Sequence, residues 1–418
     1  MAAIAIIVLN IVNSMTAKPQ SDGQPAQPPI RRLTLVIYCG FLLTVSGFSV
    51  DIMLPVFDAI AQNFGASLSL AQATIPAFMV AFAVGQILFG PLSDAFGRRP
   101  MIALGLTIYL AGTALAFWGG SIGWVLAGRA VQGLGAAAGP VIARAILRDT
   151  HSGLDLAKAM ALAMGIFSIG PIIAPLAGFA LGDLFGWRAI FAAMGILGTA
   201  LLLVDLTIFR ETNAEPDRDA ILPGRLLAAF ARIVTDRQSR YYLGLACAAY
   251  CALIAYVANG SRVYATSFGV DGLEFAVLFA ISGFGIIVGQ VGNRVLLPRL
   301  GIFSLLRLAG TILFSATLLA LVMALADWLD AISFTALMFL FNTAFLVIVA
   351  NTLTLVIDPH PQIAGLTSAF FGFVTTAISA LTAAATFNLY AGDATRWAIG
   401  MTVLTAITLA GLLRPRKV

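Results

Sequence analysis

The chain has 418 residues, of which 60% are hydrophobic and only 10% are charged, and its formal net charge is +5. Soluble domains carry about 25% charged residues, so a soluble globule of this composition would lack polar surface. The composition therefore indicates a protein of the lipid bilayer. The positive charge does not indicate a nucleic-acid-binding protein, because the arginines are spread over many connections rather than gathered on one basic face.

The region before the first long apolar stretch covers residues 1–32. Residues 1–15 are apolar but lack the basic region and small-residue cleavage site of a signal peptide. Met1 and Met15 are therefore equally plausible start positions. Residues 16–29 are rich in Pro, Gln and Ser, and they predict a disordered cytoplasmic lead-in that carries no chemistry.

Twelve stretches of mostly apolar residues follow, each close to the roughly 20 residues that a helix needs to cross a bilayer. Only helices and closed barrels satisfy every backbone amide in lipid, and these stretches are too long and alternate too little to be barrel strands. We therefore predict an all-α membrane protein, with twelve transmembrane helices in two six-helix bundles at residues 33–209 and 241–418. The stretches begin near Leu33, Leu70, Met101, Gly123, Leu156, Arg188, Tyr241, Glu274, Ile302, Leu329, Ile363 and Thr395.

Basic residues mark every second connection. The odd-numbered connections at residues 62–67, 119–121 and 327–330 contain no Lys or Arg, whereas the even-numbered ones are basic. Because cytoplasmic loops carry the positive charge, both termini are predicted to be cytoplasmic. Arg396, beside the last odd-numbered connection, is an exception.

Asp51 is an ionisable residue within the first span, in the outer half, and no cationic side chain is close to it in sequence. Such a residue costs about 2.5–3.5 kcal/mol or more near the bilayer centre, so it indicates a function. We interpret Asp51 as a site of proton or cation coupling, or as an anionic contact for substrate. The alternative is a cap on a kink at Pro55, or a position at the outer water boundary.

The connection between the second and third spans, residues 90–99, reads Gly-Pro-Leu-Ser-Asp-Ala-Phe-Gly-Arg-Arg. Asp94 is placed to accept from helix amides or to pair with Arg98 across the turn. Either this cluster gates the cytoplasmic ends of the helices, or the arginines simply hold the loop inside while the glycine turns it. The predicted gating residues are Gly90, Asp94, Gly97, Arg98 and Arg99.

The fourth span carries Arg129 and Gln132 on the helical face that also holds Gly133 and Ala136. A guanidinium group stays charged and needs a partner or water. We interpret Arg129 and Gln132 as part of the coupling site. The alternative is a structural arginine that bonds backbone carbonyls of a neighbouring helix.

The fifth span has two prolines, which remove backbone donors, and several glycines, which permit close helix approach. A bent and tightly packed helix is expected. The residues concerned are Gly165, Gly170, Pro171, Pro175 and Gly178.

A long polar connection at residues 210–240 joins the two predicted bundles. Residues 221–235 have an amphipathic pattern with arginines on the polar side, which predicts a helix on the cytoplasmic membrane surface. The bundles themselves are related by an offset of 204 residues, which superposes residues 64–65 on 268–269, residues 84–86 on 288–290 and Gly97 on Gly301. This offset indicates an internal duplication in which the second copy has lost the loop charges.

The second half offers weaker signals. Each of its polar residues either lines a central cavity or bonds neighbouring helices, and Arg262 either selects acidic or zwitterionic substrates or reaches the outer interface. The aromatic rings of Tyr250, Tyr256 and Phe345 either stack on a flat lipophilic compound or serve packing. The cavity candidates in the second half are Tyr256, Asn259, Arg262 and Asn342.

Other chemistry is not expected. The sequence has no phosphate-loop motif, so direct coupling to ATP within this chain is not expected, and it has no clustered nucleophile, base or ligand residues typical of an enzyme. The three cysteines lie in apolar spans and predict neither a metal site nor a cofactor. We expect Arg144 and Arg148 at the membrane interface and His151 and His360 in solvated connections.

Several of these motifs resemble those of the major facilitator superfamily. The pattern G-x-L-x-D-x-x-G-R-R at residues 90–99 resembles the loop between helices 2 and 3, and R-x-x-Q-G-x-G-A at residues 129–136 resembles helix 4, a region associated with proton coupling. Residues 165–178 are similar to the glycine-proline motif on helix 5 of drug/proton antiporters, although Ala174 and Pro175 replace the later glycine pair. Together with residues 51–55, 186–188 and 211–212, the pattern looks most like the Bcr/CflA multidrug-resistance group.

This resemblance implies a transporter of the bacterial inner membrane that works by alternating access and exports small amphipathic drugs in exchange for protons. Protonation of Asp51, influenced by Arg129, would favour one state over the other. The alternatives are transport of one specific metabolite on the same fold and, more distantly, a membrane enzyme or receptor. The expected partners are a small-molecule substrate, protons and the lipid bilayer, for a protein acting as a monomer without a cofactor.

Overall fold

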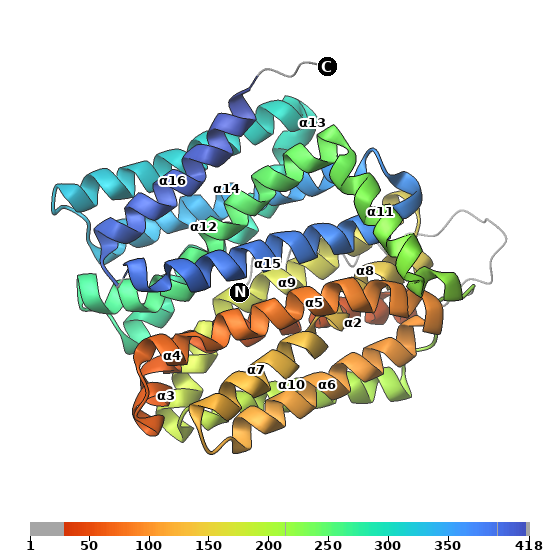
Figure 1. The fold of residues 1–418 in the computed structure, drawn as a ribbon, viewed down its shortest axis with the longest axis horizontal. Coiled ribbons are helices and arrows are strands. Elements are labelled where there is room, and N and C mark those ends of the chain that lie inside the picture. Colours follow the sequence, from red (N-terminus) through yellow and green to blue (C-terminus); the bar gives the residue numbers. More distant parts are fainter. Residues whose placement is uncertain (1–28, 214, 391, 415–418) are drawn as a thin grey trace.

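A computed structural model describes residues 29–213, 215–390 and 392–414, so the expected lead-in lies almost wholly outside the described residues. The described chain is nearly all helical and contains no strand, as predicted (Figure 1). Eleven described helical stretches are long and apolar enough to cross a membrane. The longest, α13 (Gly272–Leu325), has a non-helical backbone at Gly301 and forms two spans, which accounts for the twelfth.

The helices of the first half run from α2 to α10. They are α2 (Pro29–Asp51), η1 (Leu54–Val56), α3 (Phe57–Phe64), α4 (Leu68–Gln72), α5 (Thr74–Phe96), α6 (Arg98–Trp118), α7 (Ile122–Ala136), α8 (Ala138–Thr150), α9 (Gly153–Phe185) and α10 (Arg188–Thr207). Every predicted span of this half starts inside one of these helices, and α2 begins earlier than expected.

The connection and the second half contain the remaining helices. They are η2 (Arg218–Ile221), α11 (Pro223–Thr235), α12 (Arg237–Phe268), α13, α14 (Ala331–Ile357), η3 (Pro361–Ile363), α15 (Ala364–Tyr390) and α16 (Ala394–Leu413). The predicted amphipathic helix corresponds to α11, which packs against α12 and α15 and stacks Phe230 on Phe370 with ring centroids 4.7 Å apart.

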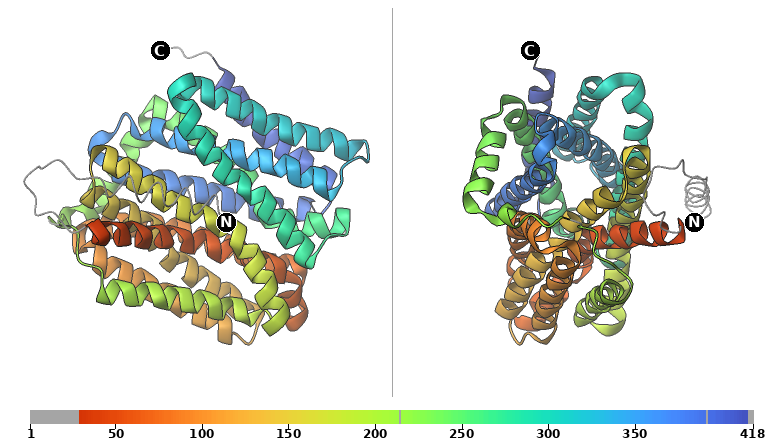
Figure 2. Two further views of the ribbon diagram at one scale, coloured as in Figure 1. Left: turned by 180° about the vertical axis from the view of Figure 1, so that it is seen from behind. Right: turned by 90° about the vertical axis from the view of Figure 1, so that its right-hand side faces the viewer.

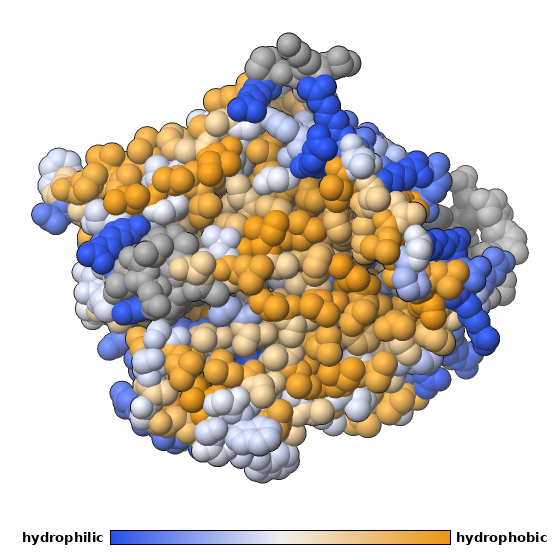
Figure 3. Space-filling view, viewed as in Figure 1, coloured by the Kyte–Doolittle hydropathy of each residue, from blue (hydrophilic) through white to orange (hydrophobic). Residues whose placement is uncertain are grey.

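The long helices lie side by side, and two further views show the same bundle from behind and from one end (Figure 2). We call the end that carries α11 and the connection between α5 and α6 the α11 end, and the opposite end, with α3 and α4, the α3 end. Apolar side chains cover much of the outer surface between these ends, where they would face lipid (Figure 3). Ile196, Leu203 and Val403 are examples of such exposed side chains.

The backbone repeats at the offset of 204 residues. Gly65 (φ 58°, ψ 29°) and Gly269 (φ 67°, ψ 21°) end helices in the left-handed conformation that favours glycine. Gly97 (φ 97°, ψ 157°) and Gly301 (φ 72°, ψ 162°) make the corresponding sharp turns after α5 and within α13. The matching conformations support the internal duplication.

The two halves of the chain touch along α5 and α15 and along α9 and α13. Towards the α11 end, Nη1 of Arg144 donates to Oγ of Ser368 over 3.2 Å. Farther from that end, Oγ of Ser168 donates to Oε1 of Gln290 over 2.9 Å. η1, near the α3 end, contacts α12 and α13. The halves are therefore in contact at several depths along the bundle.

Candidate functional site

Asp51 is the last residue of α2, and the helix breaks there for a local reason. Pro55 has no amide hydrogen to donate to the Asp51 carbonyl, so the regular ladder stops. The backbone tightens instead, with Met53 N donating to Val50 O over 3.3 Å and Val56 N to Met53 O over 3.1 Å. The chain then continues through η1 into α3.

The carboxylate of Asp51 lies beside the second half of the chain. The residue is 7% exposed, and within the described part of the chain no hydrogen bond or ion pair reaches its side chain. The Tyr256 hydroxyl of α12, in the second half, lies within electrostatic range of this carboxylate. Asp51 is therefore a buried acid without a cationic partner, at a break in a helix that contacts the other half.

The glycines of α9 set how closely this helix passes the break. A Cβ on Gly178 would lie 2.2 Å from the Ile52 carbonyl oxygen, and one on Gly170 would lie 3.1 Å from Thr44 Cγ2. Only glycine allows the first approach. Gly165 has no neighbour within 4 Å of its Cβ position, so the expectation that it permits close packing is wrong.

The two prolines of α9, Pro171 and Pro175, are buried within one continuous helix. The carbonyl of Pro171 receives no ladder bond, because Pro175 four residues later has no amide hydrogen, and it lies 3.3 Å from the Cβ position of Gly283 on α13. This part of α9 thus packs on both halves, against α2 on one side and α13 on the other.

Arg129 is fully buried inside the first half. Its Nη1 donates to Oε1 of Gln132, and its Cζ lies 4.4 Å from the centre of the Phe78 ring. Nε and Nη2 have no hydrogen-bond partner in the described chain. The structure therefore shows a charged group held by an amide and a ring, and not by the backbone carbonyls that the alternative interpretation requires.

Neutral polar groups extend this cluster towards α2 and α6. Nε2 of Gln132 donates to Oγ1 of Thr113 over 2.8 Å. The hydroxyls of Tyr109 and Ser49 are 2.8 Å apart. Sequence reasoning missed Tyr109, Ser49 and Thr113, because a single neutral polar residue in an apolar span carries no pattern that separates it from ordinary packing.

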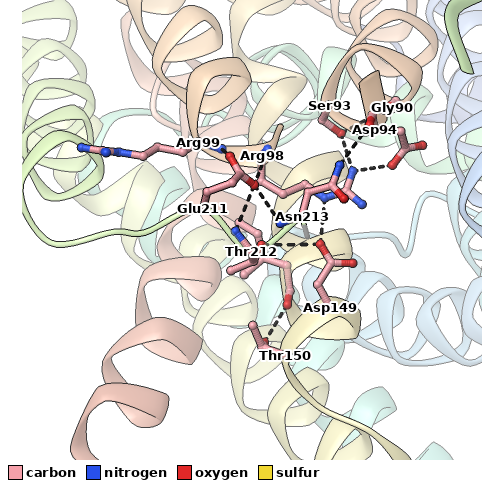
Figure 4. Close-up of polar contacts among 11 residues, drawn as sticks. Gly90, Ser93, Asp94, Arg98, Arg99, Asp149, Thr150, Glu211, Thr212 and Asn213 are labelled. Carbon is pink, nitrogen blue, oxygen red and sulfur yellow. Dashed lines mark hydrogen bonds and ion pairs between the residues drawn. The ribbon is translucent and has the colours of Figure 1, made fainter. Parts of the chain in front are cut away.

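The gating residues form a compact cluster at the α11 end (Figure 4). The Arg98 side chain, which is 6% exposed as a residue, pairs with Asp94 and donates from Nη1 to Ser93 Oγ over 2.9 Å. Its Nε donates to Oδ2 of Asp149, at the end of α8, over 2.8 Å. Asp149, which the sequence analysis did not single out, therefore binds Arg98 together with Asp94.

Glu211 supplies the cap of α6. Its Oε1 accepts from the amides of Arg98, Thr212 and Asn213 at 2.9, 2.9 and 2.8 Å, and its Oε2 accepts from Arg99 N at 3.0 Å. Partial burial raises the pKa of this carboxyl, but the four backbone donors outweigh that effect and hold the pKa below its usual value. A Cβ on Gly97 would lie 2.6 Å from Oε2, so the turn before the cap needs glycine for space as well as for its φ.

The same cluster fastens the ends of neighbouring helices. The carbonyl of Asp94 accepts from Asn213 Nδ2 over 2.9 Å and from Asp217 N over 3.0 Å. Arg99 donates to the carbonyls of Asp205 and Leu206, at the end of α10. A cavity of about 30 Å³ adjoins the cluster and extends to the second half at Gly365 and Leu366; its other lining residues are Gly90, Pro91, Ser93, Asp94, Arg98, Val141, Ala145 and Arg148.

The cavity candidates of the second half are packed rather than open. Tyr256, Asn259 and Asn342 are buried, and the Tyr256 hydroxyl lies 2.7 Å from Ser282 Oγ. Nδ2 of Asn342 donates to the Ser282 carbonyl over 3.0 Å, and Nδ2 of Asn259 donates to the carbonyl four residues earlier. The geometry favours the alternative in which these residues bond helices to one another. Arg262, three residues after Asn259 on α12, has its Cγ close to Gly392.

Two expectations about basic residues are wrong. Arg144 contacts Ser368 of the second half, so it lies between the halves rather than at the membrane interface. His360 is buried rather than solvated, and its Nε2 lies 3.1 Å from Oγ of Ser239. Hydropathy could not identify either position, because both depend on which helices pack together.

The three cysteines, Cys39, Cys247 and Cys251, are buried free thiols.

Comparison with known proteins gives consistent matches. The family model described as Major Facilitator Superfamily matches residues 39–384. The bicyclomycin resistance protein homolog of Haemophilus influenzae is 29% identical over 349 residues, covering 83% of this chain and 87% of that protein. Multidrug resistance protein D of Escherichia coli is 26% identical over 253 residues, covering 60% of this chain and 63% of that protein.

A solved structure agrees on the architecture. The crystal structure of a D-xylose–proton symporter superposes with a TM-score of 0.71 and covers 91% of this chain and 97% of its own. At 14% identity this likeness shows the fold alone.

Proposed function

The chain belongs to the major facilitator superfamily, and from that premise we propose that it exports small amphipathic drugs across the bacterial inner membrane in exchange for protons. It is a multi-pass transporter, and its relatives include proteins named for bicyclomycin and multidrug resistance. The observation that carries the proton-coupling proposal is the unpaired carboxylate of Asp51 at the end of α2, beside the second half.

Proton binding at Asp51 gives a physical reason for two states. Burying an isolated carboxylate costs far more free energy than burying the neutral acid. The protonated form can therefore stay enclosed between the halves, whereas the ionised form favours a state in which water reaches it. A proton gradient then shifts the population between the two states, as alternating access requires.

Arg129 adds a fixed positive charge within the first half. Its two unpartnered nitrogens leave it free to stabilise a negative charge that forms nearby, and Gln132 holds it in place. We propose that Arg129 influences the balance of states through this field rather than by binding Asp51 directly. Coulomb attraction of this kind persists in a dry bundle because little water screens it.

We propose that the α11 end is cytoplasmic, with both termini on that side. The basic loop residues gather there, as the positive-inside rule requires. The cluster of Arg98, Asp94 and Asp149 then closes the inner ends of the first-half helices and must rearrange when the transporter opens inward. In this proposal, bundles at residues 33–209 and 241–418 move about the connection at residues 210–240, within a single copy of the chain.

Flux into inside-out vesicles tests the proposal. Wild-type vesicles with an imposed proton gradient should accumulate rhodamine 123, a cationic dye, or a phenicol, and vesicles with Asp51→Asn should lose that gradient dependence. Gradient-independent movement in both would contradict coupling through Asp51. Gradient-driven movement of neither compound would contradict broad drug export and favour the alternative of one specific metabolite, which the fold also permits.

A further inference from the structure

Arg144 is a guanidinium group between the two halves that no acid neutralises. It lies on α8 in the first half, and its Nη1 donates a hydrogen bond to Ser368 Oγ on α15. No ion pair reaches it from the described chain. An unpaired charge among packed helices is costly, so its presence indicates a ligand that brings the opposite charge.

A partly exposed aromatic ring of the second half, that of Tyr250, lies near this charge and packs on two buried rings, those of Phe345 and Phe371. The Tyr250 hydroxyl is within electrostatic range of the Arg144 guanidinium. The ring centroid of Tyr250 lies 5.2 Å from that of Phe345 and 6.5 Å from that of Phe371, with both pairs edge to face. An apolar wall and a fixed cation therefore adjoin one another, which is the combination that binds a flat ring carrying an acidic group.

The polar side chains around Arg144 are partly accessible to solvent, unlike the polar residues deeper in the second half. Arg144, Tyr250 and Ser368 are each partly exposed although they lie between helices. Tyr256 and Asn342, in contrast, are buried and hydrogen-bonded within their own half. The partly exposed residues are therefore the ones that a ligand can reach with little repacking.

A second arginine lies between Arg144 and the α11 end. Arg148 lies one turn from Arg144 and lines the cavity of about 30 Å³ that reaches Gly365. The acid in that cavity, Asp94, is already paired with Arg98. Separation of α8 from α15 would thus expose Arg144 and Arg148 on one wall of the opening, where two adjacent cations attract anions, while the two nearby acids, Asp94 and Asp149, are held by Arg98.

We propose that Arg144 and Tyr250 form a substrate subsite for amphipathic organic anions, that is, aromatic carboxylates, sulfonates or acidic sulfonamides. Arg144 would bind the acidic group through charge-assisted hydrogen bonds, and the Tyr250 ring, held in place by the buried rings of Phe345 and Phe371, would pack on the apolar part. In the closed, substrate-free arrangement Ser368 takes the place of the anion. The subsite rests on the proposed export function and names the class of compound that it favours.

Equilibrium binding of two dyes to the purified full-length protein tests the subsite. Fluorescein and rhodamine 123 share a xanthene ring but carry negative and positive charge respectively, and both report binding by fluorescence polarisation. Arg144→Gln should weaken fluorescein binding about tenfold or more, the effect of losing a charge-assisted bond, without weakening rhodamine 123. Arg144→Lys should recover part of the affinity, because the charge remains and the planar fork is lost.

Two matched variants separate binding from architecture. Ser368→Ala removes the same inter-half hydrogen bond but keeps the cation, so it should retain fluorescein affinity. Arg307→Gln removes one exposed positive charge from α13 and should leave both dyes unaffected. Equal losses in Arg144→Gln and Ser368→Ala, equal weakening of both dyes, or a wild type that does not bind fluorescein would each overturn the proposal.

The dye-binding experiment and the vesicle flux experiment test the anion subsite and the proposed export function separately. If rhodamine 123 moves with the proton gradient while fluorescein affinity ignores Arg144, only the anion subsite is wrong. If fluorescein binding depends on Arg144 but no compound moves with the gradient, proton-coupled export is wrong and the binding site stands.

Discussion

Glu211 caps α6 by accepting the backbone amides of Arg98 and Arg99, although 113 residues separate it from the first of them. The carboxylate therefore does at long range what an N-cap side chain usually does locally. Arg98 also binds Asp149, and Arg99 binds the end of α10. Glu211 therefore orders the backbone of both arginines that hold the cluster at the α11 end together.

Replacement of Glu211 by alanine should destabilise the α11 end. Four backbone donors would lose their acceptor, and loss of a helix cap alone costs about 1 kcal/mol. We expect a lower apparent melting temperature of the detergent-purified protein, with Glu215→Ala, a nearby acid in the same connection, as the control. Unchanged melting would show that water replaces the carboxylate without cost.

The stability that Glu211 provides should depend on pH. Its pKa is held below the usual value near 4.5 in the folded protein, so the unfolded chain binds the proton first as pH falls. The contribution is therefore fully present above about pH 4.5 and is lost as pH falls through the lower folded pKa. The difference in melting temperature between wild type and Glu211→Gln should therefore be smaller at pH 4 than at pH 6, and a difference that stays constant across that range would contradict the linkage.

Hydropathy and turn chemistry predicted the helices because both are local. Each span needs only its own apolar length, and the turn glycines need only a positive φ. Gly97 and Gly301 adopt nearly the same conformation, so the offset of 204 residues identified equivalent turns before any contact was known. The break at Asp51 was likewise visible in Pro55.

The partners of the site residues depend on packing that no local pattern encodes. Arg98 was recognised from its loop, but its bond to Asp149 joins helices that are distant in sequence. Sequence predicts Arg144 to be an interfacial anchor because hydropathy gives a depth along one helix only, whereas its contact with Ser368 depends on the packing of α8 against α15. Gly165 and Gly178 are both glycines of α9 and look equivalent in sequence. Only Gly178 has the backbone of another segment, at Ile52, beside its Cβ position.

Tyr109 should stabilise the polar cluster around Arg129. Tyr109→Phe removes a hydroxyl that lies 2.8 Å from Ser49 Oγ and leaves the buried serine with one partner fewer. The expected cost is about 1 kcal/mol, measured as a lower melting temperature. In the double variant with Ser49→Ala the added loss should be smaller than the sum of the single losses, and simple additivity would show that the two hydroxyls do not interact.

The contact between α2 and α9 makes the sharpest prediction about the fold. Gly178→Ala would place a Cβ 2.2 Å from the Ile52 carbonyl oxygen, which is backbone and has no side-chain freedom with which to yield. Forced overpacking of this kind costs about 1–3 kcal/mol, so the melting temperature should fall. Because the displaced carbonyl follows Asp51 directly, gradient-driven dye uptake should also fall in vesicles with matched amounts of protein.

Gly165→Ala on the same helix is the matched control. Its Cβ meets nothing within 4 Å, and alanine favours a helix over glycine by about 1 kcal/mol, so this variant should melt at the wild-type temperature or above it. Both variants add one methyl group to α9, and they differ only in whether the backbone of α2 lies beside that methyl group. Equal melting temperatures for both would therefore mean that α9 does not approach the break at Ile52 as closely as the structure places it.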